Sequence, residues 1–375
     1  MGSEIMKIGS IYSASDKSLF DALTQSAVTN PELRELFFQY GIIISKSTSR
    51  RQLAKYFSRL LLDYGAFQIL TRLFDTGHRK ERLSCVRVKS SATLALYEDA
   101  AHRLVTAINE DGHAAKVVHQ DGQPLRIEVT YKKFRFDKNE FRQIVTKRAE
   151  VLFEQKHGQI LISGPQNEDV DVWLRSLIAD VQEHVEDVLQ IEEISLEQRK
   201  LPATRTGFFT TLVKSIEGFT FVDVSDVYLH QPKEDAGDIA LGEEPDALST
   251  DDTDEAIESS VTPDVHISRA ALRGQGVLSS KQAVDLLAQG FYIARIVWTG
   301  KTSSFDSDLY EFEAQFSEPD TCTMFSYVSK GFYAYKGDGE HNTTRSQFTK
   351  AEDTRLGRLI EEAAHRIIGK IDEKP

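Results

Sequence analysis

Apolar positions recur every three to four residues in some segments of the chain and every second residue in others, which predicts both helices and strands. Residues 15–80 show the helical spacing, with breaks near Asn30, Pro31, Gly41 and Gly65. Pro interrupts helices because it lacks an amide hydrogen, and Gly does so because its backbone loses much freedom on ordering. The amino-terminal part is therefore expected to be a set of short helices.

The following segment mixes helix and strand patterns. Residues 99–112 predict a helix that ends at Gly112, and residues 125–136 are rich in β-branched and aromatic residues, as a strand is. Residues 159–165 are an apolar run typical of a buried strand, and residues 169–190 predict an amphipathic helix. We expect this helix to bury one stripe: Val172, Leu174, Leu177, Ile178 and Val181.

Two helix–glycine–strand patterns, at residues 205–230 and 279–301, flank a strongly acidic tract. They share only the Gly-Phe pairs at 218–219 and 290–291, so both an internal duplication and the coincidence of a common local pattern stay open. A carboxy-terminal helix is expected at about residues 350–368. Three strand-like runs precede it, at residues 291–298, 309–316 and 324–336.

This order predicts an α+β fold, in which helices pack on a mixed, mainly antiparallel sheet. We expect a disordered amino terminus, a helical domain, an α+β domain, an acidic flexible linker and a second α+β domain, at residues 1–14, 15–85, 86–230, 231–268 and 269–375. The linker is predicted to be disordered because a tract without aromatic residues buries too little apolar surface to offset the entropy of ordering.

The composition is that of an ordinary globular protein, with 40% hydrophobic and 27% charged residues over 375 positions. No apolar run approaches the ~18 residues that a membrane-spanning helix needs, and the first residues lack the pattern of a secretion signal. The cysteines, Cys85 and Cys322, are too few for a disulfide framework or a structural zinc site. We therefore expect a cytoplasmic protein, not bound to a membrane, with reduced cysteines.

The formal net charge of −13 hides a strong partition along the chain. Residues 31–90 carry 12 Lys/Arg against 5 Asp/Glu, and residues 126–150 carry 8 against 4. Residues 230–268 carry one Lys against 12 acids, which accounts for most of the net charge. The acidic total therefore does not exclude a polyanionic ligand, because the basic regions are separate from the acidic one.

Residues 40–60 contain five cations and no acid. Small polar residues at 47–49 are N-cap candidates for a helix expected at about residues 50–62. Helical spacing gives this helix an apolar stripe and a charged stripe, which are Leu53, Phe57, Leu60 and Leu61 on one side and Arg51, Lys55 and Arg59 on the other.

Like charges at this spacing repel one another, and a bound polyanion would relieve that repulsion. The amino terminus of a helix also attracts phosphate. We expect phosphate contacts from five residues: Lys46, Arg50, Arg51, Lys55 and Arg59. The alternative is an ordinary solvated helix face.

Residues 33–60 resemble the SAP-type helix–extension–helix motif of chromatin and DNA-repair proteins. That motif has a leading helix, a Gly-aliphatic extension, a small polar turn, and a second helix that begins with Lys or Arg. Gly41 and Ile42 match the extension and residues 45–49 match the turn, which is longer here than is usual. The resemblance implies DNA binding with little sequence preference, through the same five cations.

Residues 41–77, followed by a mixed helix and strand remainder, resemble the companion, non-nuclease subunit of a two-gene bacterial anti-phage system of phage-satellite islands. This resemblance implies an intracellular protein that pairs with a nuclease of the PD-(D/E)xK type and helps it to engage foreign DNA. It supplies no catalytic residues.

The sequence contains no complete catalytic motif. A metal-dependent nuclease needs carboxylates for Mg²⁺ on one strand and Glu/Asp-x-Lys on the next. Glu128 and Lys132 share a strand face, and a second acidic group lies on and beside another strand (Asp306, Asp308, Glu311 and Glu313), but neither set has the required spacing. We interpret both sets as solvated strand faces. Since the histidines are scattered and no phosphate-binding glycine loop is present, no catalytic residue, metal or cofactor is expected.

Residues 131–148 interleave aromatic residues with cations. Lys132, Lys133 and Arg135 are candidates to hold single-stranded nucleic acid beside stacked aromatics. A half-buried strand with charged outer positions explains the pattern equally well.

The resulting hypothesis is a noncatalytic, DNA-binding accessory subunit of a bacterial anti-phage nuclease complex. One alternative is a metal-dependent nuclease that acts by itself. The other is a protein-interaction scaffold that contacts no nucleic acid.

Overall fold

The computed structural model describes residues 15–24, 29–62, 65, 69–70, 80–120, 123–134, 144–156, 158–231 and 268–372. The chain divides into two compact units. The first consists of Met1–Arg79, His102–Val118 and Ile127–Glu150, and the second of Lys80–Ala101, His119–Arg126 and Val151–Pro375. Helices and a large, mostly antiparallel sheet make this an α+β protein, which confirms the predicted fold class.

Short helices form the described part of residues 15–62: α1 (Asp16–Thr24), α2 (Asn30–Gln39) and α3 (Arg50–Phe57). α2 begins in a capping box, in which the amide of Thr29 donates to the Glu32 carboxylate at 2.6 Å. Gly41 follows α2 with a φ of 71°, a left-handed conformation that favours glycine. The predicted breaks near Asn30 and Gly41 are confirmed, whereas Gly65 lies in a segment mostly outside the described residues.

Large apolar side chains from all three helices share one small core. Leu23 of α1, Leu33 and Phe37 of α2, and Leu53 and Phe57 of α3 are all at most 1% exposed. The rings of Phe37 and Phe57 meet edge to face with centroids 5.2 Å apart. This packing fixes which side of α3 faces inward and therefore which side stays in solvent.

One sheet contains eleven strands within the described residues, in the order β2-β3-β4-β5-β1-β11-β10-β9-β7-β8, with β6 beside β1. Each neighbouring pair along the part β4-β5-β1-β11-β10-β9-β7-β8 is antiparallel, and so is the pairing of β6 with β1. The strands are β1 (Leu83–Lys89), β2 (Ala114–Val118), β3 (Leu125–Phe134), β4 (Ile144–Lys156), β5 (Gln159–Pro165), β6 (Gln190–Glu192), β7 (Thr220–His230), β8 (Arg269–Arg273), β9 (Tyr292–Lys301), β10 (Leu309–Glu318) and β11 (Thr323–Tyr333). A separate two-stranded pair consists of β12 (Tyr335–Gly337) and β13 (Glu340–His341).

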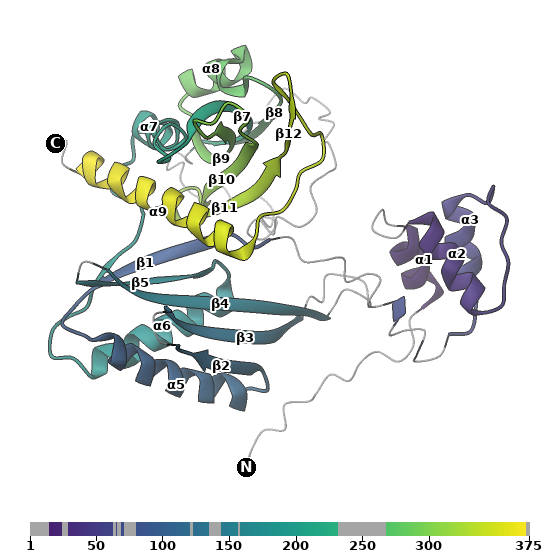
Figure 1. Ribbon diagram of the computed structural model, residues 1–375, viewed down its shortest axis with the longest axis horizontal. Helices are drawn as coiled ribbons and strands as arrows, with labels where there is room; N and C mark the ends of the chain where they lie inside the picture. Colours follow the sequence, from purple (N-terminus) through teal and green to yellow (C-terminus); the bar gives the residue numbers. More distant parts are fainter. Residues whose placement is uncertain are drawn as a thin grey trace, which may run out of the picture. The chain divides into compact units, whose positions relative to one another are not determined.

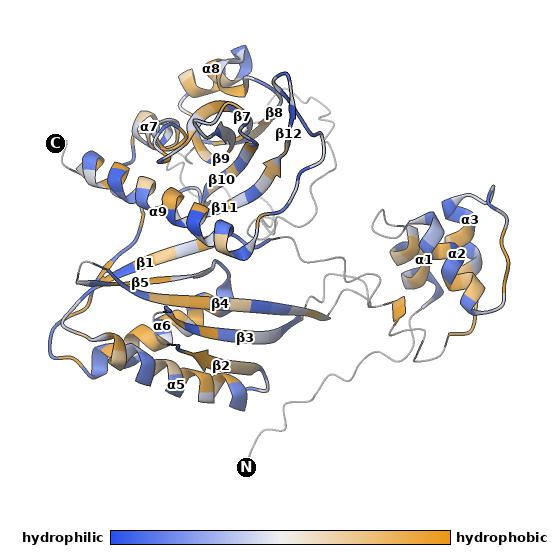
Figure 2. Cartoon of the chain, viewed as in Figure 1, coloured by the Kyte–Doolittle hydropathy of each residue, from blue (hydrophilic) through white to orange (hydrophobic). Residues whose placement is uncertain are grey.

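Helices α7 (Pro202–Leu212) and α9 (Lys350–Asp372) pack on β9 and β11 in the second unit (Figure 1). Their core buries Phe208 of α7, Trp298 of β9 and Phe312 of β10 completely or almost so. α9 carries hydrophobic and hydrophilic residues along its whole length (Figure 2), as expected for a helix with one face on a core. The other helices are α5 (Leu94–Glu110), α6 (Glu168–Glu183), α8 (Lys281–Ala288) and the short 3₁₀ helix η1 (Val277–Ser279).

Most predicted elements are present at the expected positions, including both helix–glycine–strand patterns, which become α7–β7 and α8–β9. The stripe predicted for α6 is partly wrong, because Val172 is 62% exposed and Val170 is buried instead. Val170 lies four, seven and eleven residues before the other buried positions of this helix, whereas Val172 is two residues out of that phase.

The predicted linker at 231–268 has a different topological position from the one expected. β7 and β8 pair as neighbours, with His230 opposite Arg269, and the amide of Gln231 donates to the carbonyl of Ser268 at 3.0 Å. β7 also pairs with β9, so the strands on both sides of the tract belong to the same sheet and the same compact unit. The tract therefore connects two adjacent strands and does not separate two domains. Residues 232–267 themselves lie outside the described residues.

Candidate nucleic-acid interface

α3 begins in a capping box that contains no acidic residue. The Ser49 hydroxyl accepts the amide of Gln52, and the Gln52 side-chain oxygen accepts the amide of Ser49 at 3.2 Å. Glutamate is common at this position of a capping box, but Gln52 accepts the same backbone hydrogen bond without carrying a charge. The start of the helix therefore keeps its positive dipole end without a neutralising carboxylate in its first turn.

The two faces of α3 differ as the sequence predicts. Leu53, Ala54 and Phe57 are buried, and Arg51 and Lys55 are exposed. The helix ends at Phe57, earlier than expected, and a turn carries the exposed Arg59. The prediction that Leu61 joins the buried stripe is wrong.

Leu61 is 98% exposed because the helix does not continue to it. The amide of Leu60 donates to the carbonyl of Phe57 in a tight turn, and the chain then leaves the helical path. The helical period therefore no longer determines which side residue 61 faces.

Arg50 is anchored within the protein. Its Nε donates to the carbonyl of Thr24 at 3.1 Å and its Nη2 to the carbonyl of Leu23 at 3.2 Å. These carbonyls lie at the carboxy-terminal end of α1, where a cation is favourable. Arg50 is half-buried, so its guanidinium joins the start of α3 to the end of α1.

The polar turn before α3 is held from α2. Nη2 of Arg34 donates to the carbonyl of Lys46 at 2.7 Å, and the hydroxyls of Ser45 and Ser47 are 2.8 Å apart. This hydrogen bond uses the backbone carbonyl of Lys46, so the exposed Lys46 side chain takes no part in it.

The exposed cations of this region are not neutralised locally. Within the described part of the chain, Lys46, Arg51, Lys55 and Arg59 form no ion pair with a carboxylate. Many cations of the second unit do, for example Arg87 with Glu361 at 2.9 Å. These cations have no acidic neighbour in sequence, because residues 36–62 contain no Asp or Glu.

The second basic region is only partly described. On β3, Lys132 is exposed and lies on the face opposite the buried Tyr131, whereas Lys133 is half-buried and has an interaction partner. Arg135 lies outside the described residues. Glu128, which shares a strand face with Lys132, pairs with Lys116 at 2.8 Å.

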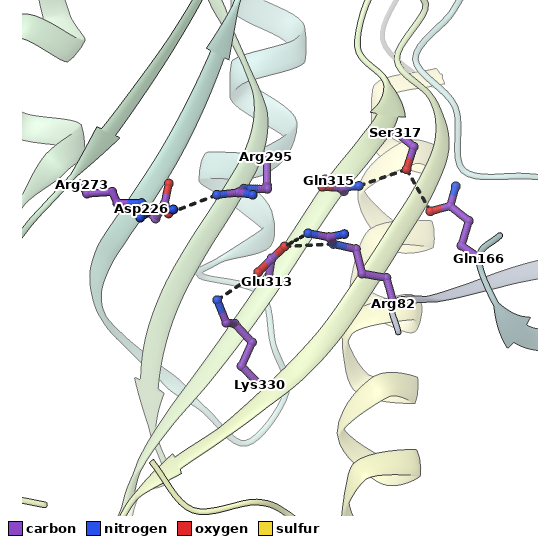
Figure 3. A network of polar contacts seen from close by, with 9 residues as sticks. All are labelled: Arg82, Gln166, Asp226, Arg273, Arg295, Glu313, Gln315, Ser317 and Lys330. Atoms are coloured by element: carbon purple, nitrogen blue, oxygen red, sulfur yellow. Dashed lines mark hydrogen bonds and ion pairs between the residues drawn. The ribbon is translucent and has the colours of Figure 1, made fainter. Parts of the chain in front are cut away.

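The interpretation of the acidic group on β10 as a solvated face is wrong for Glu313, which is 1% exposed. Arg82 Nε donates to its Oε1 at 2.9 Å, and Lys330 Nζ lies 3.1 Å from its Oε2 (Figure 3). Burial alone would raise the pKa of Glu313, but Arg82, Lys330 and Arg295 outweigh it and lower the pKa to about 2. Glu311 is similarly paired, with Arg345.

Strand register places a second carboxylate, Asp226, near Glu313 and its cations. Glu313 of β10 and Asp226 of β7 both lie opposite Val297 of β9, so they share one face of the sheet. Asp226 accepts from Arg273 at 2.9 Å and from Arg295 at 3.1 Å (Figure 3). We call Arg82, Asp226, Arg273, Arg295, Glu313 and Lys330 the sheet ion network.

Sequence reasoning missed the sheet ion network because its members are up to about 250 residues apart in sequence and follow no spacing rule. The only local signal is the placement of two carboxylates, Glu311 and Glu313, among the aromatic and apolar residues of the first half of β10. That signal fits a solvated face equally well until the partners from β9, from β11 and from Arg82, just before β1, are known.

Comparison of the chain with protein-family models and with curated proteins finds no match. None of the described helices has both the length and the apolar composition that crossing a bilayer requires. Among the described residues, no group of three His, Cys, Asp or Glu side chains is arranged to hold a metal ion.

Proposed function

We propose that residues 15–62 bind nucleic acid through contacts between their exposed cations and the phosphates. The observation that carries the proposal is the charged face of α3 and its following turn, where Arg51, Lys55 and Arg59 recur every fourth residue without a carboxylate. Within the helix, the like charges of Arg51 and Lys55 at this spacing cost ~0.2–0.5 kcal/mol. A polyanion removes that cost and gains entropy by releasing its own counterions.

Lys46 and the amino terminus of α3 extend the same surface, because the positive end of a helix dipole favours phosphate. Arg50 has a different function in this proposal. Its bonds to the end of α1 hold the first turn of α3 in place, so that the neighbouring Arg51 keeps its outward orientation.

Salt dependence tests the contact directly. With four phosphates contacted, the logarithm of the association constant for duplex DNA falls against the logarithm of salt concentration with a slope of about −4. A triple variant (Arg51→Gln, Lys55→Gln, Arg59→Gln) should weaken binding and bring the slope to about −1. The matched control neutralises three exposed lysines of the second unit: Lys200→Gln, Lys214→Gln and Lys281→Gln.

The control has the same net charge as the triple variant and should retain the slope of the unmodified protein. Equal loss in both variants would show that only net charge matters. No association with DNA or RNA at low ionic strength would refute the proposed function.

We further propose that the chain is a noncatalytic accessory subunit of a bacterial anti-phage nuclease complex, and the support is the resemblance of residues 41–77. The test is co-expression with the product of the neighbouring gene. A nuclease that co-purifies with the chain and needs it to cleave DNA would support the proposal. DNA cleavage by the isolated chain with Mg²⁺ or Mn²⁺ would replace it with the nuclease alternative.

A further inference from the structure

Exposed apolar side chains concentrate in the same region as the unpaired cations. Five of the fourteen large hydrophobic side chains that are exposed among the described residues lie between residues 38 and 61: Phe38, Tyr40, Ile43, Tyr56 and Leu61. Three of these five are aromatic. Because an exposed aromatic ring leaves its apolar surface in water, a group of them marks a contact surface more often than chance.

Tyr56 lies in the last turn of α3, between two exposed cations in sequence. It is 47% exposed, directly follows Lys55, and precedes Arg59 of the following turn by three residues. Its neighbour Phe57 is fully buried against Phe37, so the backbone that carries Tyr56 is held by the core. Tyr56 is thus presented outward from a fixed support.

The end of α2 lies beside this position. The rings of Tyr40 and Phe57 are in contact, with centroids 5.9 Å apart, which brings the carboxy-terminal ends of α2 and α3 together. Phe38, on the last turn of α2, is 64% exposed. The region therefore combines exposed aromatic rings with cations and without carboxylates.

Exposed aromatic rings beside cations favour single-stranded over double-stranded nucleic acid. In a duplex the bases are stacked on one another and only their edges are accessible, so a protruding ring has no base face to contact. In a single strand the base faces are accessible and stack on aromatic side chains, while cations follow the phosphates. A protein partner would also favour exposed aromatics, but the charge of this surface selects an anionic ligand.

We propose that residues 15–62 bind single-stranded nucleic acid, with phosphates on Lys46, Arg51, Lys55 and Arg59 and an unpaired base stacked on Tyr56. This inference rests on the proposed phosphate contact and adds the class of strand that is bound. It also adds a residue, Tyr56, that contributes no charge.

The test compares Tyr56→Leu with Tyr56→Phe in the full chain. Leucine is a good helix former at an exposed position, so the fold should be preserved, and phenylalanine retains a stacking ring. With a short oligothymidylate as the probe, Tyr56→Leu should weaken binding about 5- to 100-fold, while Tyr56→Phe stays within about twofold of the unmodified protein. Phe305→Leu, a change at a ring that is 96% exposed in the second unit, should have no effect.

A duplex of the same length should bind more weakly than the oligothymidylate, and its affinity should not respond to Tyr56→Leu. The salt slope of Tyr56→Leu should equal that of the unmodified protein, because no phosphate contact is lost.

The failures of the two proposals differ. If the triple charge variant loses binding but Tyr56→Leu does not, stacking is refuted and the phosphate contact stands. If neither probe binds, both proposals fail. If Tyr56→Leu instead abolishes binding of a protein partner and leaves the oligothymidylate unaffected, the aromatic surface is a protein-docking site and the inference is overturned.

Discussion

Glu313 keeps its charge in a position where water hardly reaches it. Desolvation of a lone carboxylate would favour the protonated form, but Arg82, just before β1, and Lys330 of β11 stabilise the ionised form more strongly. His365 on α9 is half-buried, but it loses its charge, because neither burial nor the nearby cation favours the protonated ring. Its burial, with Arg87 nearby, lowers the pKa of the imidazole to about 3 and keeps the ring neutral.

Replacement of Glu313 by glutamine should lower the free energy of unfolding by about 3 kcal/mol at neutral pH, because Arg82 and Lys330 would lose a buried counter-charge. The folded-state pKa of Glu313 lies below its ordinary value of 4.5. Its contribution is therefore complete above pH 4.5 and is lost as the pH falls towards 2. Urea unfolding of both proteins across this range measures the difference, which should shrink on acidification.

Asp306→Asn is the matched control, since this carboxylate is exposed, forms no ion pair within the described residues, and hydrogen-bonds to Ser304 and to its own backbone amide. Its free energy of unfolding should fall far less than that of Glu313→Gln, because this exposed carboxylate has no buried cation as a partner. A Glu313→Gln variant that is as stable as this control would show that the sheet ion network does not stabilise the fold.

Replacement of His365 by leucine should flatten the dependence of stability on pH between about 6.5 and 3. In the unmodified protein the unfolded chain binds a proton at His365 over this range and the folded chain does not, so stability rises with pH. Thermal unfolding at several pH values tests this, with His184→Leu as the control at an exposed histidine. A slope unchanged by His365→Leu would contradict the expectation.

At the scale of the element, α3 depends on two adjacent arginines with different surroundings. Arg50 points back to the end of α1, and Arg51 points to solvent. The helical period correctly separates buried Leu53 and Phe57 from exposed Lys55. It does not show that a neighbouring helix end offers carbonyl acceptors to Arg50.

The two arginines allow a matched experiment. Arg50→Gln should destabilise the protein by about 1–2 kcal/mol, because two charge-assisted hydrogen bonds are lost, and should leave the salt slope of nucleic-acid binding unchanged. Arg51→Gln should leave stability unchanged and reduce the slope by about 1. Thermal unfolding and salt titration of both variants check the assignment. The reverse pattern would mean that Arg50 is the contact residue.

At the scale of the whole molecule, a strongly acidic tract is inserted between β7 and β8, two strands that are already paired. Its ends are neighbours, so the sheet does not need the tract to bring them together. The tract also accounts for most of the net negative charge of a protein for which we propose a polyanionic ligand.

Deletion of residues 234–262 removes eleven carboxylates and no Lys or Arg, which changes the formal net charge from −13 to −2. The shorter connection should stabilise the sheet by roughly 1 kcal/mol through reduced loop-closure entropy. Nucleic-acid association should become faster at low salt, because electrostatic repulsion decreases, and this gain should vanish at high salt. Stopped-flow binding at two ionic strengths tests the expectation, and a rate independent of the deletion would contradict it.

Much of the fold could be predicted from local patterns. Periodicity located helices α5, α7, α8 and α9 and strands β5, β7, β9, β10 and β11, since apolar spacing reports which side of an element is buried. Strands β1, β6 and β8 of the second unit were not predicted. The exposed face of α3 was predicted in the same way. These features follow from residues close together in sequence, so local patterns are enough to predict them.

The remaining features could be seen only in the folded chain. It pairs β7 with β8 across the acidic tract, buries Glu313 among cations from other strands, and turns Arg50 away from the surface. Each of these depends on partners that are far apart in the chain, and whether a charge lies in water or against a counter-ion depends on those partners and not on the residue itself.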